Sequence, residues 1–210
     1  ASPLLLNGSV PDVRPNQEAW IAPTAGTWLF QTTGSTLTTG LGKAYLPFTP
    51  SVPGVYTLQV TADPADSGVY NDWISMGFAP EMVGEPYQTV GPWMLIGGEG
   101  TIKTALDGTG GIQTWGTNLG TGAHVLTIEL DTTPALWKVE WFVDDSSVRT
   151  YTYPTANPTI NYVQLGCNTA ATTMGTFDNF TLSFVPEPST WLVLFSGILV
   201  SAIRRRRRER

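Results

Sequence analysis

The sequence predicts an all-β protein, an antiparallel β-sandwich or jelly roll, and three observations lead to this fold class. Short runs of β-branched and aromatic residues recur through residues 1–184, separated by Gly, Pro, Asn and Asp. The 210 residues include 22 glycines and 16 prolines, a composition that suits strands joined by turns. Residues 4–184 also lack a convincing stretch with the 3.6-residue periodicity of an amphipathic helix.

The expected strands follow one another at short intervals along this region. In the run 54–61, Tyr56, Leu58 and Val60 alternate with polar or smaller residues, so they share one face of a strand. In the run 137–143, Trp137, Val139, Trp141 and Val143 share a face in the same way, and the polar segment 144–147 predicts a hairpin turn after it. The clearest strands are expected at 54–61, 73–78, 124–130, 137–143, 148–153, 162–165 and 176–184, with weaker candidates at 93–96 and 101–105.

One part of this region resembles a known family. Residues 124–131, 137–144 and 148–151 are similar to the central hairpin of concanavalin A-like and laminin-G-like jelly rolls, where a His-x-Leu/Tyr-x-Ile strand leads into an aromatic strand ending Val-Asp-Gly. Asp145 stands here in place of that glycine, and residues 175–183 resemble the last strand of such domains. The resemblance implies a fold that hosts both lectins and hydrolases, so it does not decide the function.

The charge is distributed unevenly. The last seven residues hold six arginines and one glutamate, whereas residues 1–203 hold five basic and sixteen acidic side chains, a net charge of −11. An acidic body with its basic residues confined to one terminus cannot follow a phosphate backbone, so no nucleic-acid partner is expected.

The C-terminal segment has three parts in order. Pro186, Glu187 and Pro188 end the preceding strand, and the uncharged apolar segment 190–203 follows. As a helix this segment would be about 21 Å long, short for a hydrocarbon core of about 30 Å. A cluster of arginines comes next, and it favours the cytoplasmic side, which places the acidic body outside. The cluster consists of Arg204, Arg205, Arg206, Arg207 and Arg208.

This order resembles the PEP-CTERM sorting signal of Gram-negative bacteria. The strand pattern predicts a β-sandwich domain at 1–184, and the resemblance implies a sorting signal at 185–210, with a short transmembrane helix at 190–203. It also implies cleavage by an exosortase-type membrane protease near Pro186–Pro188. The protein would then pass from an inner-membrane intermediate to the cell surface or extracellular matrix. A permanent C-terminal anchor and a buried helix of the domain remain alternatives. Because the sequence starts at Ala1 without a leader, a mature form with its signal peptide removed is expected, although a cropped sequence would look the same.

Catalytic patterns are weak. The Glu-x-Asp-x-x-Glu triplet of laminarinase-type hydrolases is approached only at Glu129 and Asp131, where Pro134 occupies the third position. His124 is the only histidine and is expected to be structural, and Cys167 is the only cysteine and is expected to be a buried thiol. We therefore predict a protein without enzymatic activity. A glycoside hydrolase or lyase of the same fold is the alternative, and a cleft shared by Glu99, Asp107, Glu129 and Asp131 would favour it.

Aromatic residues give the best indication of a ligand. The sequence has eight Trp and seven Tyr, and aromatic rings stack on the apolar faces of sugars. Trp73 and Trp115 are the candidate stacking residues, and Asp63 and Asp66 are weak candidates for calcium. No resident cofactor is expected, with calcium left open. The predicted function is binding of polysaccharide or other matrix components, with a purely structural envelope protein as a further alternative.

Overall fold

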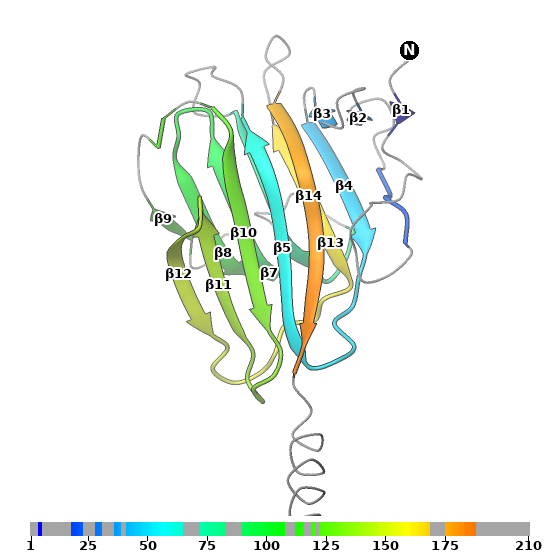
Figure 1. Ribbon diagram of the computed structural model, residues 1–210, viewed down its shortest axis with the longest axis vertical. Helices are drawn as coiled ribbons and strands as arrows, with labels where there is room; N and C mark the ends of the chain where they lie inside the picture. The colour runs from blue at the N-terminus through cyan, green and yellow to red at the C-terminus, as the bar shows by residue number, and fades with distance from the viewer. Residues whose placement is uncertain are drawn as a thin grey trace, which may run out of the picture.

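The computed structural model describes residues 4–5, 18–22, 28–30, 36–38, 41–64, 72–82, 90–107, 112–115, 119–120, 122–168 and 175–187. These residues form two antiparallel β-sheets, which confirms the predicted β-sandwich of the jelly-roll kind. Figure 1 shows β10, β5 and β14 of one sheet in front of β7, β8 and β13 of the other.

The two sheets have eight and six strands. The eight-stranded sheet runs β1 (Leu4–Leu5), β2 (Trp28–Phe30), β3 (Thr36–Thr38), β14 (Gly175–Pro186), β5 (Gly54–Asp63), β10 (His124–Asp131), β11 (Lys138–Val143) and β12 (Ser146–Thr152). The six-stranded sheet runs β4 (Leu41–Pro47), β13 (Tyr162–Asn168), β6 (Trp73–Ala79), β7 (Val90–Gly97), β8 (Ile102–Asp107) and β9 (Gln113–Trp115).

Strands of the eight-stranded sheet keep the alternation that the sequence predicts. Tyr56, Leu58 and Val60 of β5 are buried, and the residues between them are only partly buried. In β11, Trp141 and Val143 are buried in the core while Phe142 between them faces outward. One side of this sheet therefore packs on the core and the other faces solvent, as is common for antiparallel sheets.

Hydrogen bonds from a buried and a partly buried side chain join the two sheets. The Trp141 indole N–H donates to the main-chain oxygen of Trp93 at 3.1 Å, from β11 to β7. The Arg149 guanidinium donates to the main-chain oxygen and the hydroxyl of Thr104 at 3.0 and 3.2 Å, from β12 to β8. Its carbon also lies 5.2 Å from the centre of the Trp141 ring, which is cation–π distance. These contacts fix how the sheets face one another at the β11–β12 end of the sandwich.

The β11–β12 hairpin is tighter than the sequence predicts. Its turn consists of Asp144 and Asp145 alone, with φ of 47° and 63°, and β12 already starts at Ser146. Two left-handed residues suit the twist of a two-residue hairpin, a position that Gly or Asn usually takes. The sequence also missed β4 and the short strands β1, β2, β3 and β9.

Candidate functional site

The side of the six-stranded sheet that faces away from the core is unusual, because most of it is buried. Strands β6, β7 and β13 are buried at nearly every position, on both of their faces. We call this side the outer face. Its described positions fall into four rows across the strands: Asn168, Trp73 and Gly97; Lys43, Gly166, Ser75, Leu95, Lys103 and Thr114; Tyr45, Gln164, Gly77, Trp93 and Ala105; and Pro47, Tyr162 and Ala79.

The first row brings together residues that are far apart in the sequence. Trp73 of β6 lies opposite Asn168 of β13 and opposite Gly97 of β7. Residues directly opposite one another in neighbouring strands point to the same side, so these three positions share the outer face. Trp73 is partly buried and packs against a small cluster formed by Trp93, Leu95 and Ala105, separate from the main core. The predicted stacking residue Trp73 therefore lies on this face.

The carboxylate of Glu99 occupies the space beside Trp73 that Gly97 leaves open. Its two oxygens lie 2.7 and 2.8 Å from the point where a Cβ on Gly97 would stand. Glu99 belongs to the tight turn between β7 and β8, which is closed by hydrogen bonds from Gly97 to Thr101 and from Gly100 to Gly97, at 2.9 and 2.8 Å. Gly100 has a φ of +76°, which favours glycine at this turn.

In this row the Trp73 indole therefore lies between the Asn168 amide and the Glu99 carboxylate. The Oε2 atom of Glu99 is buried and has no hydrogen-bond partner among the described residues. An indole offers a flat apolar surface, a carboxylate accepts hydrogen bonds, and the Asn168 amide both donates and accepts them. An apolar platform flanked by hydrogen-bonding groups suits a sugar ring, which has an apolar face and a rim of hydroxyls.

The third row contributes buried polar groups to the same face. Trp93 is 1% exposed, and its indole N–H has no acceptor among the residues that the structure describes. Gln164 is equally buried. Gly77 lies between Gln164 and Trp93 in this row, and it has no side chain to separate them. Buried polar groups are normally satisfied, so the Trp93 indole N–H is a donor that packing alone does not require.

The remaining ligand candidates are less informative. The side chain of Trp115 lies outside the described set, although its backbone pairs with Ile102 of β8. Asp63 ends β5 and is partly buried, whereas Asp66 falls outside the described residues. Within the described ranges, no group of three or more His, Cys, Asp or Glu side chains could hold a metal ion. The calcium hypothesis for Asp63 and Asp66 stays a prediction.

Of the carboxylates that would favour a hydrolase, the described side chains of Glu129 and Asp131 belong to a different sheet from Glu99. Glu129 lies on the side of β10 that faces away from the core, in the eight-stranded sheet, opposite Glu140 of β11. Asp131 of the same strand accepts hydrogen bonds from the main chain and the hydroxyl of Thr133. Glu99 belongs to the outer face of the other sheet, and the side chain of Asp107 is not described.

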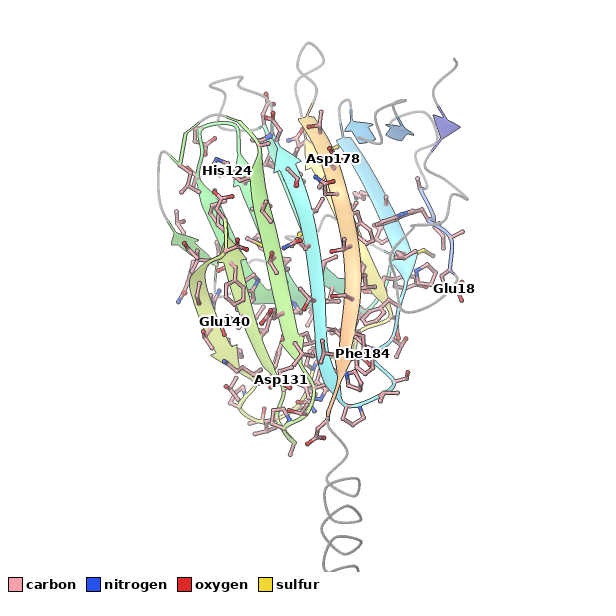
Figure 2. The ribbon with its side chains drawn as sticks, in the orientation of Figure 1. Glu18, His124, Asp131, Glu140, Asp178 and Phe184 are labelled. Carbon is pink, nitrogen blue, oxygen red and sulfur yellow. The ribbon has the colours of Figure 1, made fainter. Side chains whose placement is uncertain are left out.

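His124 has a structural partner. Its Nδ1 lies 2.7 Å from a carboxylate oxygen of Asp144, whose other oxygen accepts the Val125 N–H at 2.9 Å. Figure 2 shows His124 at the opposite end of β10 from Asp131. Partial burial alone raises the pKa of Asp144, but the hydrogen bonds from His124 and Val125 outweigh it and hold this pKa below the ordinary 3.8. The pair ties the start of β10 to the end of β11.

The prediction of a buried thiol at Cys167 is confirmed. Cys167 is fully buried among the core side chains of β13, as expected for a structural thiol. Trp141 is fully buried in the core, and Trp137 packs against it as a partly buried neighbour.

The predicted sorting motif begins inside the last strand. Pro186 is the final residue of β14 and lies opposite Gly54, and the Glu187 N–H donates to the main-chain oxygen of Pro53 at 3.2 Å. Pro188, the apolar segment 190–203 and the arginine cluster from Arg204 lie outside the described residues. In the described part of the chain, no helix is long and apolar enough to span a membrane.

Solved structures share this fold. A carbohydrate-binding module from Bacillus subtilis matches with a TM-score of 0.52 and 15% identity, over 78% of this chain and 94% of the module. An endo-1,3-beta-glucanase from Streptomyces sioyaensis matches with a TM-score of 0.59 and 14% identity, over 89% and 97%. The carbohydrate recognition domain of Emp46p matches with a TM-score of 0.57 and 11% identity, over 85% and 94%. No protein-family model and no curated protein matches the sequence. The predicted concanavalin A-like jelly roll is thus confirmed as a fold.

Sequence reasoning found Trp73 but missed its partners. Gly97 to Gly100 form a turn, and the one side chain in that turn, Glu99, folds back over β7. Asn168 and Gln164 carried no signal, because only the pairing of β13 with β6 brings them to this face.

Proposed function

We propose that this protein is a non-catalytic carbohydrate-binding β-sandwich that is exported to the cell surface or extracellular matrix. The ligand is a polysaccharide, which contacts the outer face of the six-stranded sheet at the partly exposed side chains of Asn168, Trp73 and Glu99. The observation that carries the proposal is the row of Asn168, Trp73 and the Glu99 carboxylate above Gly97. It supplies an aromatic platform with hydrogen-bonding groups on both sides, the combination that orients a small polar ligand.

Two further observations support the proposal. Proteins of the same fold include a carbohydrate-binding module and a carbohydrate recognition domain, although a shared fold does not by itself assign a function. The outer face also retains the buried indole N–H of Trp93, which has no acceptor among the described residues and would cost stability if packing were its only role.

A glycan array probed with the full-length chain tests the proposal. We expect binding to a limited set of oligosaccharides, and Trp73→Ala should weaken it at least about tenfold, as loss of a central aromatic contact does. Phe142→Ala is the matched control, since Phe142 is an aromatic residue on the solvent side of the other sheet. Absence of binding to every glycan, or equal losses in both variants, would overturn the proposal.

Incubation with the bound oligosaccharides separates binding from catalysis. The proposed binding protein leaves their chain length unchanged, as analysed by mass spectrometry. Shortened or unsaturated products would instead identify a glycoside hydrolase or lyase.

We also propose that the C-terminal segment directs export and is removed by an exosortase-type membrane protease. The proposal depends on the order of Pro186, Glu187 and Pro188, the apolar segment and the arginine cluster. The mass of the protein recovered from cells tests it, with and without the Pro-Glu-Pro motif. A wild-type mass that still includes the arginines from Arg204 onward would favour a permanent anchor.

A further inference from the structure

One carboxylate oxygen of Glu99 has no hydrogen-bond donor among the described residues. The carboxylate lies against β7, where Gly97 has no side chain, and this oxygen, Oε2, is buried. A buried charged acceptor without a donor is costly, and hydrogen bonds to charged groups are stronger than those between neutral groups. A ligand that brings a donor to this carboxylate therefore gains more than it would from a neutral acceptor.

The groups beside the carboxylate suit a positively charged donor. Trp73 lies directly opposite Gly97 on the neighbouring strand, and strands are about 4.8 Å apart. The face of an indole attracts a cation that lies within about 6 Å of the ring centre. An ammonium group placed here would have a carboxylate on one side and an indole on the other.

The net charge favours the same class of ligand. Residues 1–203 carry a net charge of −11, which repels acidic polymers and attracts cationic ones. Lys43 and Lys103 lie on the same face, in the next row, and their positive charges attract acidic groups. Tighter binding of an acidic glycan would therefore show that these lysines, and not Glu99, determine the class of ligand.

The geometry points to a subsite for a glycan that carries a free, protonated amino group, such as a polymer of 2-amino-2-deoxyhexose. The ammonium lies against Glu99, and the apolar face of the sugar ring lies on Trp73. This inference rests on the proposed function, because it assigns the ligand class of the same outer face.

Titration calorimetry on the full-length chain tests the subsite with β-1,4-linked hexamers of glucosamine, N-acetylglucosamine and glucose, and with an oligomer of a uronic acid. At physiological salt, the glucosamine hexamer should bind roughly tenfold tighter than the two neutral hexamers, the gain expected from one charge-assisted hydrogen bond at a partly exposed site. Glu99→Gln should bring the three affinities within about twofold of one another.

Two further variants test whether the preference for glucosamine comes from the Glu99 carboxylate itself or from the net charge of the protein. Glu129→Gln removes the same charge from the solvent side of the other sheet, so it should retain the preference for glucosamine. Gly97→Ala places a methyl group where the Glu99 carboxylate now lies, so it should abolish the preference without changing the net charge.

Equal affinities in the wild type, a preference that survives Glu99→Gln, or a preference that Glu129→Gln also removes would each overturn the subsite. Tighter binding of the uronic acid oligomer would overturn it too. In these cases binding of some glycan still supports the proposed function, whereas no binding to any glycan refutes the proposed function itself.

Discussion

Substitution of Gly77 by alanine tests whether the outer face is as closely packed as the structure indicates. A Cβ at Gly77 would lie 2.6 Å from the Cβ of Trp93, 2.8 Å from the main-chain oxygen of Pro92 and 2.9 Å from the Cα of Trp93. All three neighbours belong to β7 near its backbone, so they cannot rotate away as the end of a flexible side chain could. The strands β6 and β7 would have to move apart.

The expected loss follows from two opposing terms. Overpacking of a closely packed site costs about 1–3 kcal/mol. Replacement of glycine by alanine recovers about 0.4–1 kcal/mol, because it reduces the entropy of the unfolded chain. Gly77→Ala should therefore lower the free energy of unfolding by roughly 1–2 kcal/mol. For a domain of this size that is a fall in Tm of roughly 2–8 °C.

Gly97→Ala is the matched control on the adjacent strand. Its Cβ would meet the Glu99 carboxylate, the mobile end of a side chain, at 2.7 and 2.8 Å, so the neighbour can move without displacing the backbone. Urea unfolding of both variants checks the prediction, and Gly97→Ala should remain within about 0.5 kcal/mol of the wild type. Equal stability of Gly77→Ala and the wild type, or an equal loss at Gly97, would refute this account of the packing.

Three further predictions concern the body of the sandwich. Trp141→Phe removes the hydrogen bond to the main-chain oxygen of Trp93 and leaves that oxygen buried, so urea unfolding should show a loss of roughly 2–3 kcal/mol, whereas a loss below about 0.5 kcal/mol would contradict the inter-sheet contact. Because the pKa of Asp144 is lowered in the folded state, the stability that it contributes is present above pH 3.8 and is lost as the pH falls through the folded pKa. Asp144→Asn should thus lower the urea midpoint at pH 7 and have less effect at pH 3, and an equal effect at both values would argue against the contact with His124. Cys167 should react with a thiol reagent only in denaturant, because the folded core covers it, and rapid labelling of the native protein would contradict its burial.

The predictability of each strand from the sequence depended on its surroundings. Strands β5 and β11 have one side in the core and one in solvent, so Tyr56, Leu58 and Trp141 stand in clear alternation with polar residues. Strands β6 and β7 are buried on both sides, and their sequences read as mixtures of apolar and small residues without a period of two. Strand β4 was missed because Gly42 and Pro47 weaken the strand pattern, and its pairing with β13 depends on tertiary contacts.

The candidate site was predictable only in part, for a related reason. An aromatic residue such as Trp73 carries its own signal, because its size and polarity suit a partly wet surface. Asn168 and Glu99 become its neighbours through the register of β13 with β6 and the shape of the β7–β8 turn. Register is set by the packing of whole strands, and no local pattern in the sequence fixes it.

The turn at residues 97–100 shows how a segment can be a structural turn and part of a binding face at once. Gly100 adopts a left-handed conformation and closes the hairpin, and Gly97 leaves the side of β7 open. Glu99 is the one side chain in this segment, and the open position allows its carboxylate to lie against the strand instead of extending into solvent. Because a tight hairpin carries Glu99, its backbone stands in a fixed position relative to Trp73 before any ligand arrives, and the carboxylate needs only a change of side-chain rotamer to meet a ligand. A site arranged in this way loses little entropy on binding, which favours selectivity from a single well-placed carboxylate.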